Sequence, residues 1–255
     1  MKRHMQRIEF LGCPVDSLDI SDALGWIGEM VSQQKPSRIA VVNANKLWLM
    51  SKNSQLANAV ISSDLIIPEW AVYWGANKLG TPLRSYVAGV ALMQATIPWA
   101  ARNGVSLYFL GAKDEIIQAL ACKLQAEHKE LRLAGWHHGY LNTAEDQAEV
   151  IQDIQAVRPD ILFVATGSPK QELWIQDNFQ QLNVPVSMGV GGSFDVVAGL
   201  KKDTPAWARG HGLEWLYRLS QDPKAYWKRY LVTNTWIIYQ VYKRRLAKKI
   251  TTSPV

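Results

Sequence analysis

The feature that most constrains the fold is the stretch ILFVATGSPKQELWIQDN at residues 161–178, which joins an apolar run to a helical pattern. Uninterrupted apolar and β-branched runs are typical of strands buried on both faces of a parallel sheet. Gly167 permits an unusual turn, Ser168 can cap a helix, and Pro169 suits the first helical position. A helix that begins at the end of a buried strand favours binding of a phosphate at its free N–H groups. An ordinary strand-to-helix connection explains the stretch equally well.

The same alternation of apolar runs and helical patterns extends over residues 1–200. Strands are predicted within residues 7–16, 38–45, 64–70, 105–111, 131–141, 161–166 and the first part of 184–199. Helices are predicted over residues 21–33, 46–62, 71–79, 87–102, 114–128, 143–157 and 170–178. Strands that alternate with helices of this length favour a parallel sheet covered on both faces. We therefore predict an α/β domain, with a Rossmann-like, parallel-rich sheet, for residues 1–200.

Composition and missing motifs exclude several classes of function. The chain of 255 residues is 48% hydrophobic and 20% charged, as in folded globular proteins. Cys13 and Cys122 match no metal or disulfide spacing. The sequence shows no signal peptide and no membrane-spanning run, so a cytoplasmic protein is expected. The dinucleotide fingerprint, the P-loop, the D-x-D metal motif and the G-x-S-x-G elbow are all absent. We expect neither a metal ion nor a cofactor.

Residues 201–255 differ in character and are predicted to form a separate helical appendage, broken at Gly210–Gly212 and Pro223. Many of the chain's 28 Lys and Arg residues and 11 Trp residues lie here, including Lys248 and Lys249, and the net charge is +6. Basic and aromatic residues together favour an anionic membrane surface. A solvated basic face on a packed helix is the alternative, and apolar positions leave a homo-oligomer open. Nucleic acid is not expected, because no recognition module is present.

Polar residues follow the first two predicted strands, where ligands of an open α/β sheet bind. Asn43 ends the first strand, and Glu69 follows Pro68 at the end of the second. Glu69 is the only acidic side chain placed at these strand ends in the first half of the chain. A general base needs a carboxylate or imidazole within reach of the reacting hydroxyl, so Glu69 is the candidate general base.

The later strands deliver glycine-rich turns and a nucleotide-binding candidate set. These residues are Gly111, Tyr140, Gly167, Ser168, Lys170, Gly191, Gly192 and Asp195, and Gln171 beside them is a substrate-binding candidate. Two glycine turns that face one crevice suit a diphosphate, although Gly191 and Gly192 alone could form a tight turn. Tyr140 could stack on a base, and Asp195 could accept its N–H groups. His137 and His138 are adjacent and point to opposite sides, so they cannot chelate one metal ion.

Four motifs taken together resemble one family. GSPKQE, GVGGSFDVVAG, GLEWLYRL and HHGY are similar in spacing to motifs of the WecG/TagA/CpsF family of bacterial glycosyltransferases, up to about residue 232. The resemblance implies inverting, metal-independent transfer from a UDP-sugar to a polyprenyl-diphosphate-linked saccharide. It further implies a peripheral enzyme on the inner face of the cell membrane that builds exopolysaccharide, capsule, teichoic acid or common antigen.

The resemblance also implies roles for individual residues. Asn43 matches the family's first-strand Asn, Tyr140 its uracil-stacking Tyr, Gln171 a residue near the transferred sugar, and Asp195 a residue at the base. In GLEWLYRL, Arg218 is the candidate contact for the diphosphate. These residues, with Glu69 as base, form the predicted site.

The chain departs from the family pattern around its predicted base. Pro68-Glu69-Trp70 stands where the family has P-D-G, and Tyr86 precedes the V-x-G motif in place of Arg, so Arg84 is expected to supply that charge to the substrate. These changes favour a donor sugar other than N-acetylmannosamine, such as a hexose. They also motivate an alternative function, a non-catalytic UDP-sugar-binding or assembly protein on the same scaffold.

Overall fold

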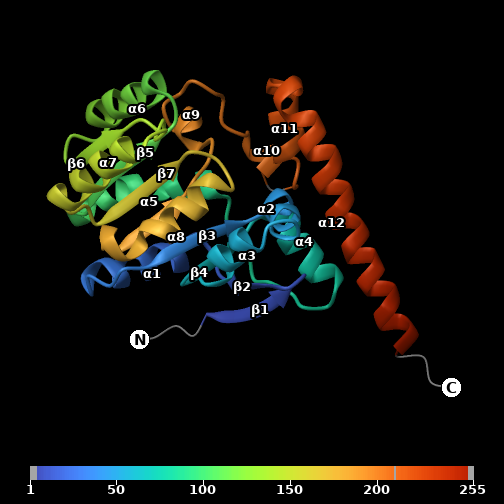
Figure 1. Ribbon diagram of the computed structural model, residues 1–255. Helices are drawn as coiled ribbons and strands as arrows, with labels where there is room; N and C mark the ends of the chain where they lie inside the picture. The colour runs from blue at the N-terminus through green and yellow to red at the C-terminus, as the bar shows by residue number, and fades with distance from the viewer. Residues whose placement is uncertain (1–4, 210, 252–255) are drawn as a thin grey trace.

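A computed structural model describes residues 5–209 and 211–251 of the protein, and side chains as far as residue 247 (Figure 1). The predicted break at Gly210, the end of the appendage at 252–255, and the side chains of Lys248 and Lys249 lie outside this description. The chain begins with an antiparallel hairpin, β1 (Gln6–Phe10) and β2 (Cys13–Ser17). This confirms the strand or hairpin predicted within residues 7–16.

A six-stranded parallel sheet forms the centre of the fold, as predicted. Its order is β4 (Leu65–Pro68), β3 (Arg38–Val42), β8 (Val186–Gly189), β7 (Ile161–Ala165), β5 (Ser106–Gly111) and β6 (Arg132–His137). The middle strands are buried along their whole length, which explains why their sequences are apolar without alternation. Because every strand is parallel, all carboxyl ends lie at one edge.

Helices cover both faces of the sheet (Figure 1). One face packs against α1 (Ile20–Ser32), α5 (Gly89–Asn103), α6 (Asp114–Glu127) and α9 (Ser193–Val197). The other packs against α7 (Ala144–Val157) and α8 (Lys170–Leu182), and, over β3 and β4, against α2 (Ala44–Met50), α3 (Ser54–Ile61), α4 (Trp70–Lys78) and the hairpin. The predicted parallel-rich fold is confirmed.

Capping side chains explain where several helices begin. Thr143 caps α7, as predicted for the helix over residues 143–157, and it also forms a capping box with Asp146. The single helix predicted over residues 46–62 is wrong, because the side chain of Asn53 accepts a hydrogen bond from the Leu56 N–H and starts α3 as a separate helix. Ser168 does not cap α8; its hydroxyl donates to Glu172 instead, at 2.7 Å.

Three helices form the described part of the appendage: α10 (Ala206–Arg209), α11 (Glu214–Gln221) and α12 (Pro223–Thr251). The long α12 runs along one side of the molecule (Figure 1) and buries Ile237 and Val241 in the same core as α2 and α4. None of the described helices combines the length and apolarity that a bilayer span requires. The domain boundary at residue 200 stays a prediction.

Candidate active site

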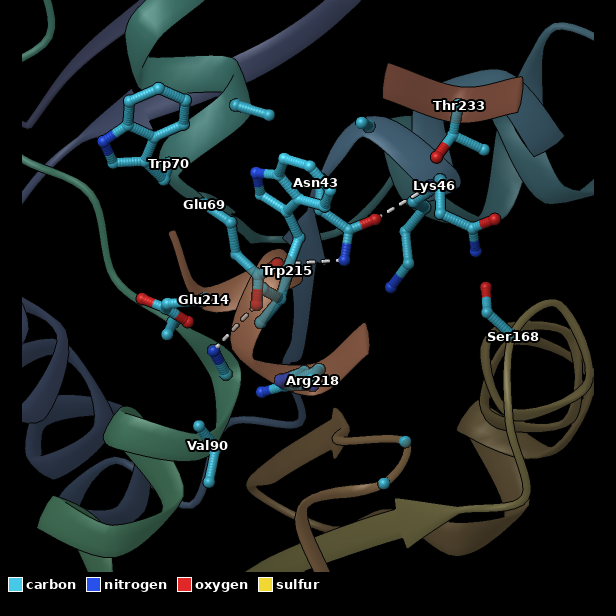
Figure 2. A pocket seen from close by; sticks show the side chains of 18 of the residues that line it. Asn43, Lys46, Glu69, Trp70, Val90, Ser168, Glu214, Trp215, Arg218 and Thr233 are labelled. Carbon is cyan, nitrogen blue, oxygen red and sulfur yellow. Dashed lines mark hydrogen bonds between the residues drawn. The ribbon is translucent and has the colours of Figure 1, made fainter. Parts of the chain in front are cut away.

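A cavity of about 360 Å³ lies at the carboxyl ends of β3, β4, β7 and β8 and is bounded on its far side by α11 and α12 (Figure 2). Both the α/β domain and the appendage therefore contribute to one cavity. Of the predicted site residues, those that line it are Asn43, Glu69, Gly167, Ser168, Gln171, Gly191, Gly192 and Arg218.

Glu69 is held in a fixed orientation at the wall of this cavity. It follows the last residue of β4 and precedes the first residue of α4. Its Oε2 accepts a hydrogen bond from Nδ2 of Asn43 at 2.9 Å, and its Oε1 accepts one from the Gly89 N–H at 3.1 Å. Figure 2 shows the bond between Asn43 and Glu69. A carboxylate with two donors on fixed elements keeps lone pairs free for a further hydroxyl proton.

Asn43 connects the predicted base to the end of the neighbouring strand. It caps α2, where its Oδ1 accepts a hydrogen bond from the Lys46 N–H at 2.9 Å. The amide nitrogen is left to donate to Glu69. An Asn at this position satisfies a free N–H of the helix and orients a carboxylate with one side chain.

Gln171 joins the two glycine turns. Its Oε1 accepts a hydrogen bond from the Gly191 N–H at 3.0 Å, and its Nε2 donates to Glu172 at 2.6 Å. A side chain on Gly189 would come within 2.6 Å of Nε2, so only glycine lets Gln171 lie across the end of β8. Gln171 is buried and lines the cavity with both amide atoms already bonded to the protein.

A buried ion pair beside the cavity was missed by sequence reasoning. Nζ of Lys46 lies 2.7 Å from Oε1 of Glu172, and both side chains are almost completely buried. Burial alone would raise the pKa of Glu172, but the charge of Lys46 and hydrogen bonds from Lys46, Ser168 and Gln171 outweigh it and lower that pKa. Lys46 follows Asn43 by one helical turn, which could have placed it at this edge. Glu172, 126 residues away, carried no such indication.

The appendage adds an acidic side chain to the cavity that sequence reasoning also missed. Glu214 and Arg218 of α11 line the cavity with Glu69 (Figure 2). Burial, followed by the negative charge of Glu69, raises the pKa of Glu214 to about 7. Two carboxyl groups and a guanidinium therefore face the same cavity. Glu214 lies within the GLEWLYRL motif, so this motif could have indicated it as a site residue.

Trp70 contacts the appendage directly at a glycine. A Cβ on Gly212 would lie 2.1 Å from the Trp70 ring, and Gly212 has φ +70°. The bulky Trp70 is therefore accommodated by a glycine in the turn that leads into α11. The position next to the predicted base is in this way coupled to the placement of the appendage.

The remaining predicted residues do not line this cavity. The guanidinium of Arg84 pairs with Asp19 at 2.6 Å and with Asp22 at 2.7 Å. Lys170 is exposed at the start of α8, next to the cavity-lining Ser168. Through its ion pairs with Asp19 and Asp22, Arg84 stabilises the start of α1.

Of the two residues predicted to bind the nucleobase, Tyr140 lies at the other end of the strand edge, whereas Asp195 lies on α9, which follows β8. Tyr140 follows β6, is 49% exposed and packs near the ring of His138. Asp195 of α9 pairs with Lys201 at 3.1 Å. A Cβ on Gly111 would come within 2.6 Å of the Ala165 backbone, so this glycine permits close packing of β5 and β7 ends. Among the described residues no group of three metal-ligating side chains is present, and both cysteines are free.

Comparisons with known proteins point to one family. The sequence model of the Glycosyl transferase WecG/TagA/CpsF family matches residues 8–251. Among similar curated proteins is the N-acetylglucosaminyldiphosphoundecaprenol N-acetyl-beta-D-mannosaminyltransferase of Staphylococcus aureus, from strains MW2, NCTC 8325 and MRSA252. Each of these is 30% identical over 226 residues, which cover 88% of this chain and 86% of the relative.

Proposed function

This chain belongs to the Glycosyl transferase WecG/TagA/CpsF family, and on that premise we propose that it moves a sugar from a UDP-sugar to a saccharide carried on a polyprenyl diphosphate. The transfer inverts the anomeric carbon and needs no metal ion. The observation that carries the proposal is the carboxylate of Glu69, fixed by Asn43 and Gly89 in a cavity that two glycine turns also line.

Glu69 acts as the general base in this reaction. It takes the proton of an acceptor hydroxyl, whose oxygen attacks the anomeric carbon from the face opposite the nucleotide. The bond from that carbon to the UDP oxygen breaks, and UDP leaves with the bonding electrons. The transition state is oxocarbenium-like, as in the hydrolysis of glycosides.

The donor nucleotide occupies the strand edge from β8 toward β6. The turns at Gly167 and Gly192 offer backbone N–H groups to its phosphates, while the Gly191 N–H donates to Gln171, and these groups stabilise the charge that grows on UDP. Ser168, Lys170 and Gly111 flank this path, and Tyr140 and Asp195 bind the uracil of the donor. Gln171 sets the spacing of the turns and contacts the transferred sugar, and Arg84 is the remaining substrate-binding candidate from the sequence.

The acceptor enters from the side of the appendage. Arg218 of α11 and Arg229 of α12 line the cavity and suit the diphosphate of the acceptor, because one guanidinium group can donate two parallel hydrogen bonds to a phosphate group. The basic and aromatic α12 places the protein on the anionic inner face of the cell membrane, where a lipid-linked acceptor lies. Synthesis of a bacterial surface polysaccharide is the corresponding role.

The donor sugar is a separate question, because Trp70 departs from the family's P-D-G pattern. The relatives are named for an N-acetylmannosaminyl transfer to N-acetylglucosaminyl diphosphoundecaprenol. Trp70 beside Glu69 fills space within the cavity wall, and this favours testing a hexose donor alongside N-acetylmannosamine. The same feature supports the second candidate, a UDP-sugar-binding protein without turnover.

A screen of UDP-sugars separates the two candidates. A bound ligand raises the thermal stability of the folded protein by mass action, so the donor is found by its shift in Tm. Release of UDP is then measured with and without a polyprenyl-diphosphate saccharide. Release that depends on the acceptor supports the transferase, whereas a stabilising UDP-sugar that no acceptor turns over supports the binding protein.

A further inference from the structure

A second cavity, of about 660 Å³, adjoins the catalytic one and differs from it in chemistry. Its walls are formed mainly by Trp70, Trp74, Trp215, Trp227, Leu231 and Ile238. Among the described residues, those that line this apolar groove carry no charged side chain, whereas the catalytic cavity holds Glu69, Glu214 and Arg218. Trp70 and Trp215 line both cavities, so the groove is continuous with the catalytic cavity.

One wall of the groove begins at the residue next to Glu69. Trp70 directly follows Glu69, and its ring stacks on that of Trp74 one helical turn later, with centroids 6.4 Å apart. Figure 2 shows Trp70 and Trp215 beside Glu69. A ligand that extends from Glu69 past Trp70 would therefore pass from a polar to an apolar environment.

Large apolar side chains are left exposed along this groove. Leu231 is 62% exposed, Trp227 48% and Ile238 46%, although each lies on the helix that packs onto the domain. Contiguous exposed apolar surface on a soluble protein usually marks a binding site. The continuity with the catalytic cavity selects a ligand that reaches both.

Two arginines stand where the cavities meet. Arg218 lines the catalytic cavity from α11, between the groove residues Trp215 and Leu219. Arg229 lines it from α12, immediately before Tyr230, which contributes to both cavities. A molecule bound across the junction would meet carboxylate and guanidinium groups in one cavity and an apolar surface in the other.

We propose that this groove binds the isoprenoid chain of the acceptor, in the units nearest its diphosphate. The inference rests on the proposed function, which supplies an acceptor made of a saccharide, a diphosphate and a polyprenyl chain in that order. The catalytic cavity, with its arginines, suits the saccharide and the diphosphate, and the adjoining apolar groove suits the polyprenyl chain. Contacts of the isoprenoid chain with this groove contribute to binding of the acceptor, so recognition of the isoprenoid chain does not depend on the membrane alone.

The proposal is tested by binding, with no donor and no transfer. Geranyl diphosphate, a short isoprenoid diphosphate, is titrated calorimetrically into the full-length protein, with inorganic diphosphate as the probe without a tail. We expect geranyl diphosphate to bind at least about tenfold more tightly, because apolar carbons leave water. Leu231→Ala should reduce this preference about threefold or more. Equal affinity of the two probes overturns the proposal.

Leu246 provides a matched control on the same helix. It is 61% exposed, against 62% for Leu231, and lines neither cavity. Leu246→Ala should leave the preference for geranyl diphosphate unchanged. An equal loss in both variants would mean that the isoprenoid tail adsorbs on the surface of α12. If the protein is a dimer that Leu231→Ala dissociates without a change in tail preference, the groove belongs to an interface with a second copy. Either result overturns the proposal.

Failure of this inference is distinct from failure of the proposed function. A protein that prefers geranyl diphosphate but never releases UDP keeps the groove and loses the transferase. A protein that transfers sugar but binds both probes equally keeps the transferase and loses the groove.

Discussion

Replacement of Glu214 by Gln should make the stability of the protein less dependent on pH. Glu214 belongs to the appendage but faces Glu69 across the catalytic cavity, and burial together with that negative charge raises its pKa from the ordinary 4.5 to about 7. The unfolded chain loses this proton near pH 4.5, while the folded chain keeps it until about pH 7. Between these values the unfolded state binds fewer protons, so the free energy of unfolding falls as pH rises.

The size of the effect follows from the two pKa values. Their difference, 7 − 4.5 = 2.5 pH units, corresponds to at most about 3.4 kcal/mol at about 1.36 kcal/mol per pH unit. Glu214 is only partly buried, and solvent screening reduces this to about 1–2 kcal/mol. The wild-type protein should lose that much stability between about pH 5 and pH 8, in excess of Glu214→Gln.

Urea unfolding of both proteins at the two pH values measures this difference. Glu149→Gln, on the exposed side of α7, is the matched control and should follow the wild type. If Glu214→Gln loses as much stability as the wild type over the same range, Glu214 is not held protonated by Glu69 and burial. The appendage would then not lie against the cavity as described.

Two further changes test how the site is assembled. Lys46→Met leaves the buried Glu172 carboxylate without its cation and should lower the free energy of unfolding in urea by about 3–5 kcal/mol. Adding Glu172→Gln should recover part of this loss. Full stability of Lys46→Met would contradict the buried pair. Gly212→Ala places a Cβ 2.1 Å from the Trp70 ring at φ +70° and should lower kcat/KM about tenfold by displacing α11. Adding Trp70→Ala should restore part of that activity, and no loss in Gly212→Ala would show that the appendage does not need this contact.

Features that depend on local sequence could be predicted. The strand at residues 161–165 is apolar because it is buried on both faces, and Thr143 caps a helix through its own side chain. Parallel strands bring their carboxyl ends together, so Asn43, Glu69 and the turn at Gly191 were expected at one edge. The same rule could not predict that Tyr140 after β6 lies far along the edge from Glu69 after β4, because the order of strands in a sheet does not follow from any single segment.

Features that depend on contacts between distant segments could not be predicted. Lys46 and Glu172 form their ion pair only after two helices meet, and neither helix alone requires a buried charge. The approach of Glu214 to Glu69 depends on where the appendage folds back. Trp70 was expected to favour a different donor sugar, but the glycine that accommodates its ring lies in the appendage and could not be identified from the segment around Glu69.

The most direct test of Glu69 as the general base is the rate of acceptor-dependent UDP release by Glu69→Gln, measured beside its Kd for UDP. We expect the variant to fold and to bind UDP within about twofold of the wild type, while kcat falls by about 10²-fold or more, as loss of a general base requires. Full activity of the purified Glu69→Gln protein would contradict this role, and the proton of the acceptor would then have to go to another group.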